Sequence, residues 1–324
     1  MFENLVATLK AEKRKIVFTE GSDPRILEAA SRLKKDDILD SILVGNVDEV
    51  KKAASDAGFD IQGLEIIDPE KFEKMDEMVS KMVELRKGKM TEEQCRTALA
   101  KGNYFGTMLV KMGYADALLG GATYSTADTV RPALQIIKTK AGNKIVSSCF
   151  ILCRTDKDGN EEKYAMGDCA INISPNEDEL VEIAIETAKT AKVFGIDPKV
   201  AMLSYSTMGS GKGETVDMVR NATEKAKQAA PEIAIDGELQ FDAAFSPVVA
   251  KTKCKGSPVA GQANTFIFPD INAGNIGYKI AQRLGGFEAY GPILQGLNAP
   301  INDLSRGCNA DEVYQMAIIT AGLK

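Results

Sequence analysis

The chain has 324 residues, of which 44% are hydrophobic, and a formal net charge of −6. Single cores stop growing near roughly 250 to 300 residues, so this length favours two domains. Because charges of both signs are interspersed, we expect no basic face for nucleic acid and no polybasic cluster for a membrane, which leaves small molecules as partners.

Neither the N-terminus nor the rest of the chain shows a targeting or membrane segment. Glu3 stands where a signal peptide has its positive region, and charged residues recur by Lys10. No stretch approaches the roughly 18 apolar residues of a membrane span. We therefore expect a cytoplasmic chain.

The chain has no histidine, and its six cysteines show neither a C-x-x-C pair nor a zinc spacing. The absence of histidine excludes Ser-His-Asp and Cys-His nucleophiles and histidine-based metal sites. Any proton transfer must therefore use Asp, Glu, Lys, Tyr or Cys. We expect the cysteines to be reduced thiols, mostly within the core.

In the first half of the chain, short apolar runs alternate with amphipathic helices. Pro24 marks the first position of a helix, and Thr91 with Gln94 forms a capping box for another. The expected strands are 15–19, 41–45, 64–67 and 115–121, and further helices are expected over 69–86 and from 121 to about 138.

A change of pattern near residue 145 indicates a second domain. A strand over 144–154, turn residues at 156–160 and a returning strand over 163–173 predict an antiparallel hairpin. A capping box at 174–177, with its proline at the first helical position, predicts a helix that runs to Gly195.

The rest of the chain continues the alternation of strands and helices. The expected strands lie near 199–206, 233–236, 264–268 and 288–294, and the expected helices near 215–230, 272–284 and 309–321. This pattern predicts an α/β protein with mostly parallel, doubly wound sheets that helices cover on both faces.

Segments rich in Gly, Ser, Thr and Arg follow several predicted strands, at the sheet edge where α/β proteins bind ligands. In the first, residues 120–132, small residues and hydroxyls such as that of Thr126 would let an anion approach the backbone, and Arg131 could hold two oxygens. An ordinary capped turn with a solvated arginine explains the same residues about equally well.

The second such segment, residues 204–213, fits neither nucleotide-binding template. A Walker loop needs Gly at 206 and Ser or Thr at 213, where this chain has Ser206 and Gly213; the dinucleotide fingerprint needs Gly at 214, where it has Glu214. Ser206 and Thr207 remain candidates for another kind of phosphate-binding loop, and a flexible strand-to-helix loop is the alternative.

Arg86 is a third candidate, in the last turn of a predicted helix. The helix dipole favours a cation there by about 0.3 to 1 kcal/mol, so a structural role explains this residue when it is taken alone.

The most informative segment is 290–312, which leads into the last predicted helix. Its prolines and glycines predict a rigid, irregular loop. Ser305 and Arg306 lie just before the helix N-terminus, where a hydroxyl, a guanidinium and free amides could bind one anion. Asn309 and Glu312 form an N-cap box. This structural role explains Glu312, but it does not explain Ser305 or Arg306.

Residues 298–308 resemble the C-terminal signature of the phosphate acetyl/butyryltransferase family, in its phosphate acetyltransferase branch. Residues 19–25 and 123–132 are similar to other blocks of this family, in the family's order over nearly the whole chain. The resemblance implies a fold like that of isocitrate and isopropylmalate dehydrogenases. It implies a first domain of 1–144 plus 296–324, a second of 145–295, an active site in the cleft between them, and a homodimer.

The resemblance also implies roles for individual residues. The family's essential serine and arginine fall on Ser305 and Arg306, and its other binding arginines fall on Arg86 and Arg131. Its proposed base falls on Glu312, but relatives usually have an acid followed by Asp here, and this chain has Asp followed by Glu, which leaves Asp311 and Glu312 both open. Further candidates for binding substrate or CoA are Thr126, Ser206, Thr207 and Tyr290.

The implied reaction converts acetyl phosphate and coenzyme A into acetyl-CoA and phosphate, by direct thiol attack in a ternary complex. A carboxylate would take the thiol proton, Ser305 would donate to the carbonyl oxyanion, and Arg306 would hold the phosphoryl group. CoA would be a co-substrate, and we expect no metal, no tightly bound cofactor and no covalent enzyme intermediate.

Three alternatives stay open. The chain could be a phosphate butyryltransferase-like enzyme for longer acyl phosphates. It could be a metal-dependent decarboxylating dehydrogenase of the same fold, although the sequence shows no convincing cluster of aspartates for Mg²⁺. It could also be a non-catalytic phosphate- or CoA-binding protein, which would need the arginines but neither Ser305 nor the acidic pair.

Overall fold

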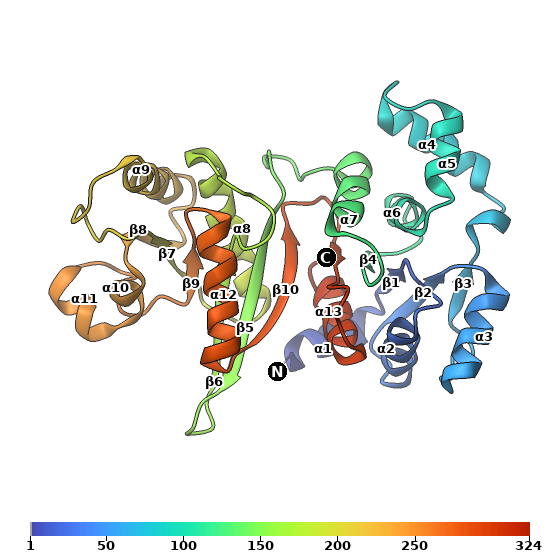
Figure 1. The fold of residues 1–324 in the computed structure, drawn as a ribbon, viewed down its shortest axis with the longest axis horizontal. Helices are drawn as coiled ribbons and strands as arrows, with labels where there is room; N and C mark the ends of the chain where they lie inside the picture. The colour runs from blue at the N-terminus through green and yellow to red at the C-terminus, as the bar shows by residue number, and fades with distance from the viewer. Residues whose placement is uncertain (1) are drawn as a thin grey trace. The chain divides into compact units, whose positions relative to one another are not determined.

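The computed structural model describes residues 2–324 and divides into two compact units. The first unit contains the residues up to Ala141 together with Leu297–Lys324, and the second contains Gly142–Gly296. Each unit is an α/β structure with its own sheet (Figure 1). Both ends of the chain therefore belong to the first unit.

The sheet of the first unit has five strands, and all neighbouring strands are parallel. In spatial order they are β11 (Ile301–Asp303), β4 (Ala117–Gly120), β1 (Lys15–Phe18), β2 (Asp40–Val44) and β3 (Glu65–Ile67). The helices of this unit are α1 (Glu3–Glu12), α2 (Pro24–Lys35), α3 (Val47–Ala57), η1 (Pro69–Lys71), α4 (Met75–Arg86), α5 (Glu92–Leu99), α6 (Gly102–Lys111), α7 (Thr126–Pro132), η2 (Ala133–Ile137) and α13 (Ala310–Gly322).

Local sequence explains why these elements form. The last three residues of β1 are fully buried, as expected of a parallel strand that is covered on both faces. α2 begins where the Asp23 carboxylate accepts a hydrogen bond from the Arg25 amide, with Pro24 at the first helical position. The predicted start of this helix and the capping box at Thr91 are both confirmed.

The sheet of the second unit has six strands and is mixed. In spatial order they are β10 (Glu288–Gln295), β5 (Ser147–Thr155), β6 (Glu161–Gly167), β9 (Thr265–Ile267), β7 (Lys199–Leu203) and β8 (Ala234–Leu239). β5 is antiparallel to both of its neighbours, β10 and β6. The pairs β6 with β9, β9 with β7, and β7 with β8 are parallel. The helices are α8 (Glu177–Val193), α9 (Glu214–Ala229), α10 (Phe241–Phe245), α11 (Pro247–Lys253) and α12 (Ile271–Gly285).

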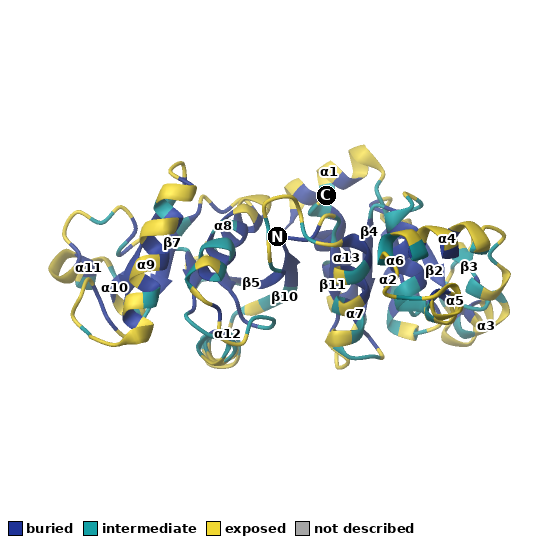
Figure 2. Cartoon of the chain, turned by 90° about the horizontal axis from the view of Figure 1, so that it is seen from above, coloured by how far each residue is buried: buried dark blue, intermediate teal, exposed yellow. Residues whose placement is uncertain are grey.

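Helices cover both faces of this second sheet. Along β7, Val200 and Met202 belong to a buried cluster with side chains of α8 and α9, whereas Ala201 and Leu203 belong to a second cluster with α10 and α12. In Figure 2 strands such as β4 and β7 are mostly dark blue, while the solvent-facing parts of helices such as α9 are yellow. The predicted α/β class with mostly parallel, doubly wound sheets is therefore confirmed.

Three predictions about elements need correction. β6 ends at Gly167 and not near 173, because the chain turns back and the Asp168 carboxylate accepts the amides of the following residues. α8 begins at Glu177 with Asn176 as its cap, so Pro175 precedes the helix. The strand predicted near 288–294 is β10, but the irregular loop expected after it also contains a strand of its own, β11. The sequence analysis also missed the helices α1, α3, α6, α10 and α11.

Candidate active site

Three chain segments meet at the carboxyl edge of the first unit's sheet. β11, β4 and β1 are adjacent and parallel. Asp303 of β11 pairs with Gly120 of β4, and Leu119 of β4 pairs with Phe18 of β1. The segments that follow these strands therefore begin at the same edge, where open α/β sheets bind ligands. They include two of the predicted anion-binding segments and the block at residues 19–25.

Ser305 and Arg306 are exposed in the loop between β11 and α13. The Ser305 hydroxyl oxygen accepts a hydrogen bond from the Gly307 amide at 3.2 Å, which leaves its own hydrogen free to be donated. Within residues 2–324 the Arg306 guanidinium makes no hydrogen bond or ion pair. The loop therefore presents a donor hydroxyl and an unpaired cation next to a helix N-terminus, which together suit an anionic oxygen ligand.

The Arg25 side chain binds backbone carbonyl groups of this loop. One guanidinium nitrogen donates to the carbonyl oxygens of Arg306 at 2.9 Å and Cys308 at 3.1 Å, and the other donates to the Ala122 carbonyl at 2.9 Å. Asp23 pairs with the same guanidinium at 2.7 Å. The sequence analysis assigned Arg25 no role, although its position at the start of α2, in the helix that follows β1, placed it at this edge.

Asp303 is a buried carboxylate directly before the loop, with only 2% of its surface exposed. It accepts hydrogen bonds from the hydroxyls of Thr126 at 2.6 Å and Thr129 at 2.5 Å. Burial raises the pKa of Asp303, while the two hydroxyls and the positive charge of Arg306 oppose that shift. The sequence analysis did not single out Asp303 or Thr129.

Glu20 is another carboxylate at this edge, and it is partly buried. It accepts hydrogen bonds from the Thr123 amide at 2.9 Å and from the Thr19 hydroxyl at 2.8 Å. The Thr19 hydroxyl also lies 2.7 Å from the Tyr124 hydroxyl. Burial raises the pKa of both Glu20 and Tyr124. None of these residues was a predicted site residue.

The two acidic residues at the start of α13 point to different partners. Asp311 is largely exposed and pairs with Arg32 of α2 at 2.6 Å. The Glu312 carboxylate turns back and accepts the Asn309 amide at 2.9 Å, and the Asn309 side chain accepts the Glu312 amide, so the predicted capping box is confirmed. Glu312 also helps to raise the pKa of the Cys308 thiol, although burial is the main cause. Glu312 therefore faces the loop end of α13.

Arg86 and Arg131 lie around a common polar cluster. Arg86 donates weakly to the Gln135 carbonyl at 3.4 Å, and its buried Nε has no hydrogen-bond partner in the described part of the chain. The Tyr104 hydroxyl donates to the Gln135 side chain at 2.9 Å. Burial raises the pKa of Tyr104, while Arg131 and Arg86 both oppose the shift. Arg131 is exposed and interacts with Asp128 at 3.3 Å.

The other three candidates, Ser206, Thr207 and Tyr290, belong to the second unit. Ser206 and Thr207 are buried, and their hydroxyls donate to the side chains of Glu238 at 2.8 Å and Gln240 at 3.1 Å. Tyr290 donates to the Glu288 carboxylate, and burial raises the pKa of Tyr290. In the structure all three hydroxyls are thus engaged with neighbouring side chains.

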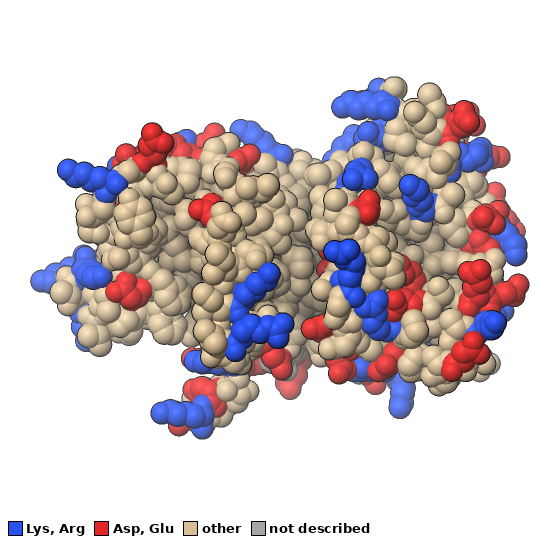
Figure 3. Space-filling view, viewed as in Figure 1, with Lys and Arg blue, Asp and Glu red and all other residues tan. Residues whose placement is uncertain are grey.

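Other features of the described residues bear on the predictions. All six cysteines are buried free thiols, as expected. Over residues 2–324 there is no group of three acidic or thiol side chains placed to hold a metal ion. No helix in this range is long and apolar enough to cross a membrane. Figure 3 shows basic and acidic side chains interspersed over the visible face.

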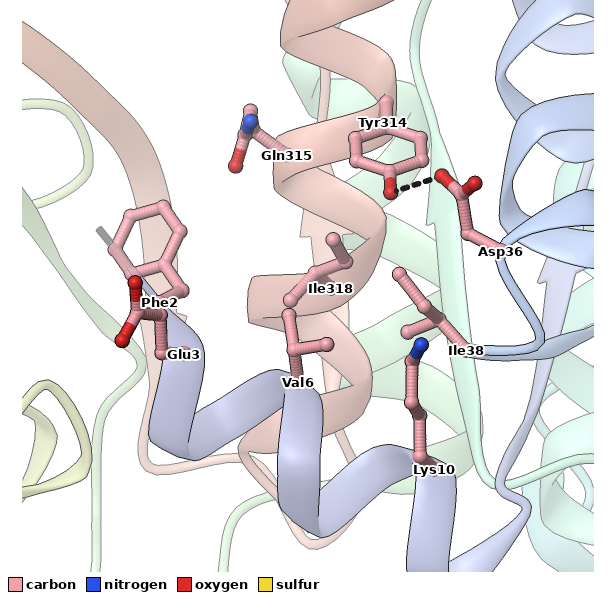
Figure 4. A pocket seen from close by; sticks show the side chains of 9 residues that line it. All are labelled: Phe2, Glu3, Val6, Lys10, Asp36, Ile38, Tyr314, Gln315 and Ile318. Atoms are coloured by element: carbon pink, nitrogen blue, oxygen red, sulfur yellow. Dashed lines mark hydrogen bonds between the residues drawn. The ribbon is translucent and has the colours of Figure 1, made fainter.

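A groove of about 400 Å³ lies between α1 and α13 (Figure 4). Its floor is apolar, with Val6 and Ile318, and Lys10 stands at its rim. Tyr314 and Asp36 also line the groove, and the Tyr314 hydroxyl donates a hydrogen bond to the Asp36 carboxylate at 2.7 Å. None of the predicted site residues lines this groove.

An α/β unit that presents a free hydroxyl and an unpaired guanidinium at the carboxyl edge of a parallel sheet has the features of a protein that binds small anionic ligands. The family model described as Phosphate acetyl/butaryl transferase matches residues 1–321. The chain belongs to this family, which confirms the predicted resemblance.

Individual relatives agree with this assignment. A phosphate acetyltransferase of Bacillus subtilis is 55% identical over 321 residues, which are 99% of this chain and 98% of that protein. The crystal structure of a phosphotransacetylase from Streptococcus pyogenes matches with a TM-score of 0.96 at 55% identity, covering 99% of this chain and 97% of that one. A phosphotransacetylase from Staphylococcus aureus matches with a TM-score of 0.92 at 50% identity, covering 99% and 98%.

Proposed function

We propose that this chain is a phosphate acetyltransferase, which moves an acetyl group between phosphate and coenzyme A. The observation that carries the proposal is the exposed loop with Ser305 and Arg306 at the carboxyl edge of the sheet, where the guanidinium has no hydrogen bond or ion pair with any described residue. The relatives that are named phosphate acetyltransferase match nearly the whole chain, which favours this activity over that of a dehydrogenase of similar fold.

Arg306 binds the phosphoryl group of acetyl phosphate in this proposal. A guanidinium can donate two parallel hydrogen bonds to phosphate oxygens, and it neutralises the charge of the phosphate as it leaves. Ser305 donates its free hydroxyl hydrogen to the carbonyl oxygen, which becomes negative as the thiol attacks. Loss of one such donor typically costs about 2.7 to 4 kcal/mol in barrier height.

Glu312 is the base that we propose, in preference to Asp311. A thiol with a pKa near 8.5 is only a few per cent ionised at pH 7, so a carboxylate that accepts its proton raises the reactive fraction. Glu312 faces the loop end of α13, whereas Asp311 is paired with Arg32 on α2. The proton moves to Glu312, the sulfur attacks the carbonyl carbon, and the bond from that carbon to the phosphate oxygen breaks.

Arg86 and Arg131 add binding sites for substrate anions. Arg131 is exposed, and the Arg86 Nε has no protein partner among the described residues, so an anionic oxygen there would gain a hydrogen bond. Coenzyme A carries several phosphate groups of the right charge. For Ser206, Thr207 and Tyr290 the engaged hydroxyls favour an indirect role, in which they shape the second unit.

We also propose that the chain forms a homodimer in the cytoplasm, through α12. Ile276, Ile280 and Leu284 are 57%, 53% and 85% exposed, and they recur every four residues along one face of this helix. Large apolar side chains in a continuous stripe are typical of a protein contact. A second copy of the same stripe can cover it because a twofold interface pairs one patch with itself.

The direct test is to mix the purified protein with acetyl phosphate and CoA and to follow thioester absorbance. We expect turnover without added metal or nicotinamide, and slower turnover with butyryl phosphate. Arg306→Ala should abolish it, while Arg220→Ala, at an exposed arginine of α9, should leave it unchanged. Binding of CoA without turnover would instead indicate a non-catalytic protein, and faster turnover of butyryl phosphate would indicate a butyryltransferase.

A further inference from the structure

We infer that Asp303 is a positioning residue, whose buried carboxylate fixes the loop carrying Ser305 and Arg306 against the helix that carries Arg131. The inference rests on the proposed function, because it concerns the placement of the groups that bind the phosphoryl and acyl oxygens. It assigns no contact with substrate to Asp303 itself.

The contacts of Asp303 join two segments that are far apart in the sequence. Asp303 is the last residue of β11 and lies two positions before Ser305. Each of its carboxylate oxygens accepts one hydroxyl from α7, from Thr126 at 2.6 Å and from Thr129 at 2.5 Å. The next residue, Leu304, donates its amide to the Gly120 carbonyl at 2.7 Å. Both the side chain and the backbone at the start of the loop are therefore fixed.

The same helix places the second group of cations. Thr126 is the first residue of α7 and Arg131 is the sixth, so they are separated by roughly 7 to 8 Å along the helix axis. α7 continues directly into η2, where the Gln135 carbonyl accepts a hydrogen bond from Arg86 and the Gln135 side chain accepts one from the Tyr104 hydroxyl. A carboxylate that fixes α7 to the loop thus sets the position of Arg131, and of the segment that Arg86 contacts, relative to Arg306.

The fold makes specific room for this carboxylate. Gly121 adopts a φ of +97°, and a Cβ there would stand 2.2 Å from Asp303 Oδ1, so only glycine admits the carboxylate. Burying a charge is costly unless hydrogen bonds compensate, and an apolar side chain would fill the same space without that cost. Packing alone therefore does not explain a carboxylate at position 303, whereas its hydrogen bonds to the two threonines of α7 do.

Thr126 acts through Asp303 in this view. Its hydroxyl hydrogen is donated to the carboxylate, so the hydroxyl has no hydrogen left for a substrate oxygen. This differs from the direct role in substrate or CoA binding that the sequence suggested for Thr126. The two roles predict different behaviour when substitutions at Thr126 and Asp303 are combined.

The test begins with the wild-type chain in the thioester assay, since absence of turnover there would contradict the proposed function and not the role of Asp303. With an active wild type, Asp303→Asn should lower kcat by about ten- to a hundredfold, the loss typical of a small misplacement of catalytic groups. KM should change much less. Asp236→Asn is the matched control, because Asp236 is also buried, accepts the Ser257 hydroxyl and belongs to the second unit. It should lower the melting temperature and leave kcat within about twofold of wild type.

Paired substitutions at the two threonines complete the test. Thr126→Val and Thr129→Val remove the hydroxyls and should lower kcat, whereas Thr126→Ser and Thr129→Ser keep them and should restore it. In the Asp303→Asn background, the two valine substitutions should have no further effect on kcat. The inference would be overturned by wild-type kcat in folded Asp303→Asn, or by a further increase of KM when Thr126→Val is added to Asp303→Asn.

Discussion

The Ser206 hydroxyl donates a hydrogen bond to the Glu238 carboxylate across 2.8 Å, and the Gly209 amide donates to the same oxygen at 2.7 Å. Glu238 is only 1% exposed. The sequence of this loop suggested a cradle for a phosphate, and the structure places an internal carboxylate against its hydroxyl and amide. This hydroxyl and this amide are thus satisfied within the chain.

Ser206→Ala should therefore change stability rather than substrate binding. Removing a hydrogen bond to a buried charge costs about 1.5 to 3 kcal/mol, so the free energy of unfolding should fall by that amount. KM for acetyl phosphate and for CoA should stay within about twofold of wild type. Urea unfolding and steady-state kinetics measure the two effects, with Ser80→Ala as a control for an exposed hydroxyl. A tenfold rise in KM would show that Ser206 binds substrate.

The raised pKa of Glu20 predicts a pH-dependent stability. Below the ordinary value of 4.5 the carboxyl is protonated in both the folded and the unfolded chain. As the pH rises above 4.5, the unfolded chain ionises first, so the wild type loses stability until the pH passes the raised folded pKa. Glu20→Gln cannot ionise, and it should become progressively more stable relative to wild type over this window.

Glu84 provides a control with the opposite sign. It is exposed, and its pKa is lowered by its hydrogen bond and ion pair with Lys81. Its ionised form therefore favours the folded chain above the ordinary pKa, and the wild type should gain stability relative to Glu84→Gln as the pH rises. Urea unfolding at a series of pH values follows both differences. A stability difference for Glu20→Gln that is flat with pH would contradict the burial of its charge.

Features of the site that depend on neighbours in the sequence could be predicted. The N-cap box of Asn309 and Glu312 spans only four residues, and the pattern specified it without knowledge of the fold. The alternation of apolar runs and helices likewise predicted the parallel sheets, whose carboxyl edges bring Ser305 near residues 120–126. Motifs and periodicity therefore identified the loop and the edge on which it lies.

The buried polar contacts behind that loop could not be predicted in the same way. Asp303 bonds to Thr126 over a separation of 177 residues, and Thr19 approaches Tyr124 over 105 residues. Propensity and spacing do not predict which of several hydroxyls contacts a given carboxylate, because the order of the strands in the sheet determines which residues become neighbours. The strand β11 was missed for a related reason, since its three residues lie among prolines and glycines that favour a loop.

The apolar stripe on α12 indicates how the proposed dimer could be broken. In the proposed contact, an aspartate at Ile280 or Leu284 would bury an unpaired charge within the apolar stripe, which is strongly unfavourable. Both variants should be monomeric by light scattering at concentrations where the wild type is dimeric, with unchanged folding by circular dichroism. Val248→Asp is the control, because Val248 is 76% exposed on α11. Dissociation by Val248→Asp alone would place the contact elsewhere.

The base can be identified from two amide substitutions at the start of α13. Glu312→Gln keeps a residue that completes the capping box, so the helix should remain intact while the proton acceptor is lost. General base catalysis typically contributes about 10²- to 10⁴-fold, and kcat should fall by an amount in this range. Asp311→Asn breaks a largely exposed pair with Arg32, which is worth at most about 1 kcal/mol of stability, and it should leave kcat close to wild type. The reverse pattern would make Asp311 the base, and near-normal rates in both variants would mean that neither carboxylate accepts the thiol proton.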